Sequence, residues 1–108
     1  MSLNYKGQNL FIENTSIKSI VRKNHTPFYL YSYKKIKDNF ENFYNYFKKV
    51  SPLVCFSVKS NSNVSILTEL RKLGSGADVV SEGELLKALK AKINPKKIVF
   101  SGVGKTDS

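Results

Sequence analysis

The segment from residue 53 to residue 101 alternates between short apolar runs and amphipathic stretches, and this alternation constrains the fold more than any other feature of the chain. The apolar runs predict strands at 53–58, 77–80 and 97–101, and no Asn-Gly or Asp-Gly pair joins them as hairpins. The stretches between the runs are long enough for crossover helices. The order strand, helix, strand, helix, strand therefore predicts an α/β fold with parallel strands and right-handed crossovers.

End signals mark both crossover helices. Asn63 is a predicted N-cap for the first helix, and Gly74 supplies its C-terminal stop. Ser81 is a predicted N-cap for the second, with Glu84 at the capping-box spacing. The buried stripe that we expect on the second helix consists of Leu85, Leu86 and Leu89.

The chain before residue 53 has weaker signals for secondary structure. Residues 8–12 predict a short strand, and Ser16 or its neighbour Thr15 is a candidate cap for a brief helix. Residues 26–31 are rich in β-formers, with a proline at their entrance that suits an edge strand. A helix is predicted from residue 33 until Ser51-Pro52, and the face that we expect it to bury consists of Ile36, Phe40, Phe43, Tyr44 and Phe47.

The composition limits the classes of function. The net charge is +10, but sixteen of the eighteen basic residues are Lys, whereas base readout and bidentate phosphate binding favour Arg. We therefore expect no nucleic-acid binding. No window reaches the roughly 18 apolar residues of a membrane span, so we expect a cytoplasmic protein without membrane contact. The single cysteine, Cys55, excludes an internal disulfide and lacks neighbours at metal-ligand spacing, so no metal site is expected.

Lys59 follows the first predicted strand at its carboxyl end, where ligands gather in α/β folds. Period-two alternation places it on the strand face of Ser57, opposite Phe56 and Val58. If Phe56 and Val58 face the covering helices, Lys59 points to the interior of a barrel. A desolvated lysine is a nucleophile for Schiff-base formation. From spacing alone, a strand-end lysine that extends to water is the simpler interpretation.

Asp78 is an acidic residue inside the second apolar strand, where a charge requires partners. Two interpretations are equally favoured: a functional group that faces the same interior as Lys59, or a strand-end carboxylate satisfied by backbone N–H groups. The Gly-Lys-Thr at 104–106 does not form a P-loop, because the first glycine of that motif would have to stand at Val99.

Three segments resemble successive motifs of the diaminopimelate decarboxylase family. They are FSVKSNSN at 56–63, GADVVSEGEL at 76–85 and VFSGVGKTD at 99–107, and their order and spacing also agree with the family. TPFYLY at 26–31 resembles the family's entry segment. The chain departs from the usual pattern at four positions: His25, Ser57, Ser60 and Glu82.

The resemblance implies an alanine-racemase-like enzyme that uses pyridoxal 5'-phosphate. Residues 1–32 would contribute to a β-rich domain, and residues 33–108 would form about three strands of an incomplete (β/α)8 barrel. Lys59 would carry the cofactor as a Schiff base, and Asp78 would line the same cavity. The implied reaction converts meso-diaminopimelate to L-lysine, by a homodimer in which the family builds its sites across the interface.

A complete (β/α)8 barrel takes about 250 residues, so we expect this chain to be an N-terminal fragment that is inactive alone. Three alternatives remain open at this point. They are a related decarboxylase acting on ornithine, arginine or a polyamine precursor, a non-catalytic cofactor-binding barrel protein, and a basic binding module.

Overall fold

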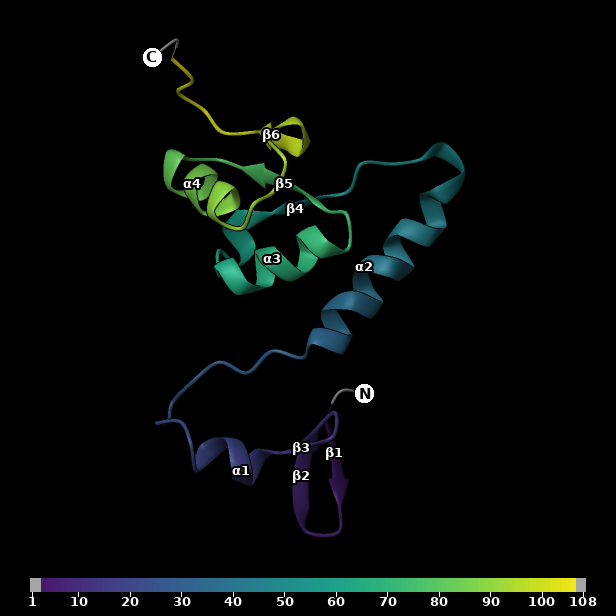
Figure 1. Ribbon diagram of the computed structural model, residues 1–108, viewed down its shortest axis with the longest axis vertical. Helices are drawn as coiled ribbons and strands as arrows, with labels where there is room; N and C mark the ends of the chain where they lie inside the picture. The colour runs from purple at the N-terminus through teal and green to yellow at the C-terminus, as the bar shows by residue number, and fades with distance from the viewer. Residues whose placement is uncertain (1–2, 107–108) are drawn as a thin grey trace. The chain divides into compact units, whose positions relative to one another are not determined.

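The computed structural model describes residues 3–106, which are arranged as two compact units (Figure 1). The units comprise Met1–Asp38 and Asn39–Ser108. Each unit is described by itself.

The first unit begins with a small antiparallel sheet. Strands β1 (Leu3–Lys6) and β2 (Asn9–Ile12) form a hairpin whose turn contains Gly7 at a φ of +61°, which favours glycine. Strand β3 (Thr15–Ser16) pairs with β2 and leads into helix α1 (Ile17–Val21). The strand predicted at 8–12 is confirmed, whereas β1 was not anticipated. The brief helix is also present, but its N-cap Ser16 makes no side-chain capping bond.

The strand predicted at 26–31 is wrong. This segment belongs to no strand, and the Thr26–Pro27 peptide bond is cis. A strand needs a neighbour to satisfy its backbone N–H and C=O groups, and neither β1, β2 nor β3 pairs with this segment. Its β-forming residues therefore remain largely uncovered, and Tyr29 is 88% exposed.

Helix α2 (Tyr33–Phe47) begins at a set of hydrogen bonds within the first unit. The Ser32 hydroxyl accepts from the backbone N–H of Lys35 at 3.0 Å and donates to the Glu13 carboxylate at 2.5 Å. Glu13 also accepts from the backbone N–H of Lys34 at 3.1 Å. These bonds lower the pKa of Glu13 and satisfy N–H groups that a helix start leaves without partners.

The predicted length of α2 is confirmed, but its predicted buried face is wrong. No residue of α2 is buried among the described residues, and Phe43 and Phe47 are 54% and 49% exposed. Their rings contact each other instead, with centroids 5.2 Å apart. A 3-10 turn (Lys48–Val50) follows α2, and Ser51 at a φ of +49° ends the helical backbone before Pro52, as expected.

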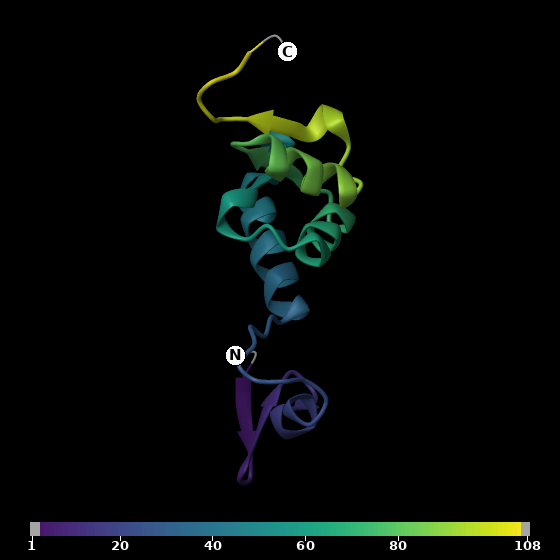
Figure 2. The same cartoon turned by 90° about the vertical axis from the view of Figure 1, so that its left-hand side faces the viewer.

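The second unit contains the predicted parallel sheet. Its strands β4 (Cys55–Ser57), β5 (Gly76–Val79) and β6 (Ile98–Phe100) lie in chain order, and α3 (Val64–Lys72) and α4 (Glu82–Lys90) connect them. Figure 2 shows both helices on one side of this sheet. The α/β order and the parallel pairing are confirmed.

The strand register divides the sheet into an apolar face and a polar face. Phe56 pairs with Ala77, and Ala77 pairs with Ile98. These side chains pack against the helices in a core whose buried members are Val58, Leu67, Ala77, Val79, Ala88, Ala91 and Ile93. Burial of this apolar surface is the main stabilising contribution to the unit. The alternate residues, on the face away from the helices, are Cys55, Ser57, Gly76, Asp78 and Val99.

The predicted caps of α3 and α4 are confirmed. Asn63 accepts from the backbone N–H of Ser65 at 2.9 Å, and Gly74 ends α3 at a φ of +97°. Ser81 accepts from the N–H of Glu84 at 3.3 Å. The Glu84 carboxylate returns to the backbone N–H of Val80, one residue before the usual capping-box partner, at 2.9 Å.

The predicted stripe of α4 is wrong at two of its three positions. Leu85 packs against the core, but Leu86 and Leu89 are 58% and 41% exposed. The buried residue of α4 is Ala88, which lies one turn after Leu85 on the same face. Ala88 belongs to the same buried core as Ala77 and Val79 of β5.

Strands β4 and β6 are shorter than predicted, whereas β5 has the predicted length and begins one residue earlier. Only Cys55, Phe56 and Ser57 find register partners on β5, so β4 covers half of the predicted run at 53–58. After Ser57 the chain turns, and its backbone groups bond within the turn instead of to a neighbouring strand.

Replacement of Gly76 by alanine tests the close packing of the sheet. A Cβ at this position would lie 2.2 Å from the backbone oxygen of Lys97 and 2.8 Å from the sulfur of Cys55. We expect Gly76→Ala to destabilise the fold by about 1–3 kcal/mol, as overpacking of a core does. The measurement is the free energy of unfolding by chemical denaturation.

Gly83→Ala is the matched control. The nearest atom to a Cβ at Gly83 is the Ser81 hydroxyl oxygen at 4.0 Å, and the position lies in the first turn of α4. Alanine favours the helix there by up to about 1 kcal/mol. Equal losses of stability in the two variants would contradict the close packing at Gly76.

Candidate functional site

Three side chains from three adjacent strand ends meet on the polar face of the sheet. Asp78 lies on β5, Ser57 lies opposite it on β4, and Ser101 follows β6. The Ser57 hydroxyl donates to Asp78 Oδ2 at 3.0 Å, and the Ser101 hydroxyl donates to Asp78 Oδ1 at 2.5 Å. The backbone N–H of Ser101 bonds to the carbonyl oxygen of Val79 at 3.0 Å and so extends the pairing of β5 and β6.

Lys59 lies in a 3-10 turn (Val58–Ser60) at the carboxyl end of β4, and not on the strand itself. Val58 is fully buried in the core and anchors this turn. The Ser60 hydroxyl donates to the carbonyl oxygen of Ser57 at 2.7 Å, and the N–H of Asn61 donates to the carbonyl oxygen of Val58 at 3.1 Å. The turn therefore holds the backbone of Lys59 while its side chain is exposed.

The electrostatics favour an ionised Asp78. The Ser101 hydroxyl, followed by the Ser57 hydroxyl, lowers the pKa of the Asp78 carboxyl against the opposing effect of desolvation. The positive charge of Lys59 acts in the same direction. The polar face thus carries a stabilised anion within electrostatic reach of a lysine.

The structure brings Lys59 and Asp78 to the same end of the sheet. The interpretation in which backbone N–H groups satisfy Asp78 is wrong, since two serine hydroxyls bind the carboxylate. Sequence reasoning missed Ser57 and Ser101 as partners of Asp78. Strand parity could have indicated both, because each lies on the face of Asp78 at the end of a neighbouring strand.

Cys55 lies on the same face but deeper in the sheet. Its thiol lies 3.7 Å from the backbone oxygen of Lys97 and is half-buried. Desolvation, followed by the negative charge of Asp78, raises the pKa of Cys55, so the thiol form is favoured. Within residues 3–106 no group of three or more His, Cys, Asp or Glu residues could hold a metal ion. No helix in this range is long and apolar enough to span a membrane.

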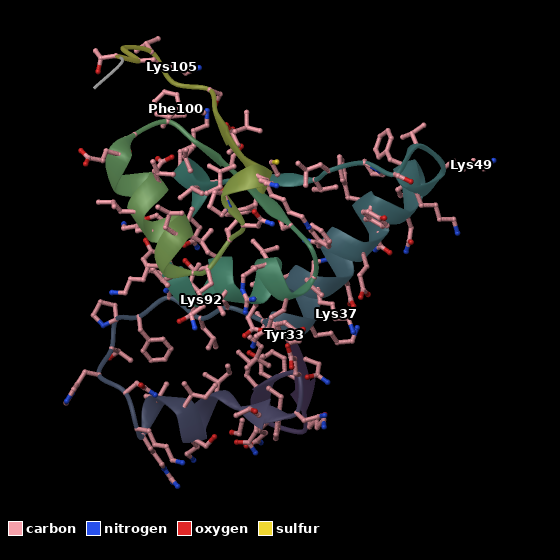
Figure 3. All side chains as sticks on the ribbon, turned by 45° about the horizontal axis from the view of Figure 1, so that its top comes forward. Tyr33, Lys37, Lys49, Lys92, Phe100 and Lys105 are labelled. Carbon is pink, nitrogen blue, oxygen red and sulfur yellow. The ribbon has the colours of Figure 1, made fainter. Side chains whose placement is uncertain are left out.

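Lys105 occupies a different environment from Lys59. Figure 3 labels Lys105 and Phe100 at the same end of the chain, and the Lys105 ammonium lies over the Phe100 ring, 5.2 Å from its centroid. The backbone at 101–106 has no regular structure, so no helix N-terminus is present there to bind a phosphate group.

The chain is similar to known proteins over most of its length. Residues 33–108 match the family model described as the pyridoxal-dependent decarboxylase, pyridoxal binding domain. The chain is 59% identical over 81 residues to a diaminopimelate decarboxylase of Helicobacter pylori, covering 75% of this chain and 20% of that protein. It is 45% identical over 105 residues to that of Aquifex aeolicus, covering 97% and 24%. The chain thus spans about a fifth to a quarter of these relatives.

Solved structures agree with this similarity. The crystal structure of diaminopimelate decarboxylase from M. jannaschii in complex with L-lysine matches with a TM-score of 0.90 at 36% identity, over 97% of this chain and 26% of that one. The H. pylori enzyme with L-lysine matches with a TM-score of 0.78 at 52% identity, over 82% and 23%. The match of the family model over most of the chain shows that this chain belongs to the pyridoxal-dependent decarboxylases, through their pyridoxal binding domain.

Proposed function

We propose that this chain is the N-terminal part of a diaminopimelate decarboxylase and that Lys59 carries its cofactor. One observation carries the assignment of the site: Lys59 follows a strand end next to an ionised Asp78, inside the region that matches the pyridoxal binding domain. The names of the relatives support the choice of substrate.

The residues on the polar face fit pyridoxal phosphate. The Lys59 amine makes no hydrogen bond or ion pair in the part of the chain that the structure describes, so it is available to an aldehyde. Asp78 provides a fixed negative charge close to that amine. The cofactor, when bound, supplies a ring that delocalises the negative charge left on the substrate when carbon dioxide departs.

The proposed roles follow from the positions of these residues. Lys59 Nζ anchors the cofactor between turnovers, and the buried Val58 keeps the turn that carries it in place. Asp78 favours a proton on that nitrogen through its negative charge. A phosphate-binding site and a partner for the ring nitrogen belong, in this proposal, to parts of the enzyme outside these residues.

We also propose that the sheet is the first part of a (β/α)8 barrel. In the described residues β4 and β6 each pair on one side only, and closure of a barrel would pair both free edges. Residues 1–32 would contribute to a β-rich domain, and residues 33–108 would start the barrel. We propose a cytoplasmic homodimer that binds an amino-acid substrate and neither nucleic acid nor membrane.

Removal of the Lys59 amine tests the assignment. In the full-length enzyme, Lys59→Ala should abolish the cofactor adduct that borohydride traps and lower kcat by at least about 100-fold, because no other amine would anchor the cofactor. Mass spectrometry of the reduced protein measures the adduct. Lys105→Ala is the control and should retain both properties, since Lys105 lies over a phenylalanine ring. Loss of the adduct in Lys105→Ala alone would contradict the assignment.

Activity on different amino acids tests the substrate. We expect kcat/KM for meso-diaminopimelate to exceed the values for L-ornithine and L-arginine by at least about 100-fold, because a site that binds both ends of its substrate rejects an analogue that lacks a polar group. Release of carbon dioxide measures all three reactions. A preference for ornithine or arginine would support the related decarboxylases instead, and binding of cofactor without any turnover would support a non-catalytic barrel protein.

Residues 1–108 expressed alone should show no decarboxylation of diaminopimelate. Two strands of the sheet would keep an unpaired edge, and the polar face would lack the elements that close the site. Turnover by this chain after removal of any full-length enzyme would contradict the proposal. Salt-dependent retention of the same preparation on a polyanion would support the basic binding module.

A further inference from the structure

The hydrogen bonds of Asp78 form a bridge across three strands. Each carboxylate oxygen has its own donor: Ser57 on β4 binds Oδ2, and Ser101 after β6 binds Oδ1. The two donors belong to strands that pair with opposite sides of β5. The carboxylate is therefore held from both sides of its own strand.

This arrangement fixes both the charge and the orientation of Asp78. An ionised carboxylate only accepts hydrogen bonds, and each serine hydroxyl has one proton to donate. Both protons are directed at Asp78, so the ionised form satisfies both hydroxyls, whereas a protonated form would compete with one of them. Two bonds to different oxygens also oppose rotation of the carboxylate about its terminal torsion.

The charged and titratable groups near Asp78 are Lys59, in the turn after β4, and Cys55, on β4. Lys59 is exposed and Cys55 favours its thiol form, so Lys59 supplies the positive charge that faces Asp78. On β6 the register partner of Asp78 is Val99, which is uncharged. Among these groups, Lys59 is therefore the cation on which the charge of Asp78 acts.

We propose that Ser57 and Ser101 are positioning residues that hold Asp78 as an oriented anion beside Lys59 and thereby keep the Lys59 nitrogen protonated when the cofactor is joined to it. This inference rests on the proposed function and deepens it, since it names residues that act on the cofactor lysine through Asp78. Neither serine contacts the reacting atoms in this account.

A pair of matched substitutions at Ser101 isolates the hydroxyl. Ser101→Thr keeps a hydroxyl and Ser101→Val replaces it by a methyl group of similar shape, and the exposed position leaves room for both. The readout is the visible absorption of the full-length enzyme with pyridoxal phosphate, titrated with pH. The midpoint reports the proton on the nitrogen that joins lysine and cofactor.

We expect Asp78→Asn to lower this midpoint by about 1–3 pH units, because the opposite charge is lost. Ser101→Val should lower the midpoint by a smaller amount, and Ser57→Ala should act in the same direction. Ser101→Thr, which retains a hydroxyl, should have the midpoint of the unaltered enzyme. Ser65→Ala, on the exposed surface of α3, is the control and should leave it unchanged. Equal midpoints for Ser101→Val, Ser101→Thr and the unaltered enzyme would overturn the inference.

Thermal stability of the cofactor-free enzyme gives a second test. The folded-state pKa of Asp78 is lowered, so its stabilising effect is present above the unfolded-state pKa and is lost as the pH falls through the folded-state pKa. Ser101→Val raises the folded-state pKa, so its Tm should begin to fall at a higher pH than that of Ser101→Thr. Identical pH profiles would show that Ser101 does not hold the anion.

The two tests separate this inference from the proposed function. If the unaltered enzyme shows no cofactor absorption, or if Lys59→Ala retains it, the proposed function fails and the role at the cofactor fails with it. If the absorption is present and depends on Lys59 but does not respond to Ser101→Val, the proposed function stands and the inference is wrong.

Discussion

The parallel register of β4, β5 and β6 is the constraint on which the rest of the second unit depends. It aligns Phe56, Ala77 and Ile98 across the sheet on the face that α3 and α4 cover. Side chains alternate along a strand, so the same register places Ser57 and Asp78 together on the opposite face. A shift of one residue would expose the core side chains and bury the carboxylate. The same strand register therefore produces both the packed core and the polar face.

Close approach of the strands reinforces this register. Gly76 leaves no space for a Cβ between β5 and the backbone at Lys97, so a side chain at this position is incompatible with the observed pairing. The position lies at the amino end of β5, and Asp78 lies two residues later on the same face. A glycine without a side chain thus helps to determine where the Asp78 carboxylate lies.

The turn after β4 connects the core to the candidate site. Val58 inserts into the core with no exposed surface, and Lys59 follows it with an exposed side chain. Of these two adjacent residues, Val58 packs in the core and Lys59 faces solvent. The turn ends the strand early, and this leaves the amine of Lys59 beyond the sheet, where the charge of Asp78 still reaches it.

The sequence by itself determined the order of elements in the second unit, the caps at Asn63 and Ser81, and the candidates Lys59 and Asp78. These features depend on local chemistry: periodicity of apolar residues, capping side chains and the cost of a charge inside an apolar strand. Motif resemblance added the family, which the comparisons then showed.

The tertiary structure decided what depends on neighbours distant in the chain. Residues 26–31 have strand-forming side chains but no strand to pair with, and Leu86 and Leu89 have apolar side chains but no surface to cover them among the described residues. In the same way, Asp78 obtained its partners from Ser57 and Ser101, which lie 21 and 23 residues away in sequence. Propensity and periodicity describe one segment at a time, whereas burial and hydrogen bonding depend on which segments the fold brings together.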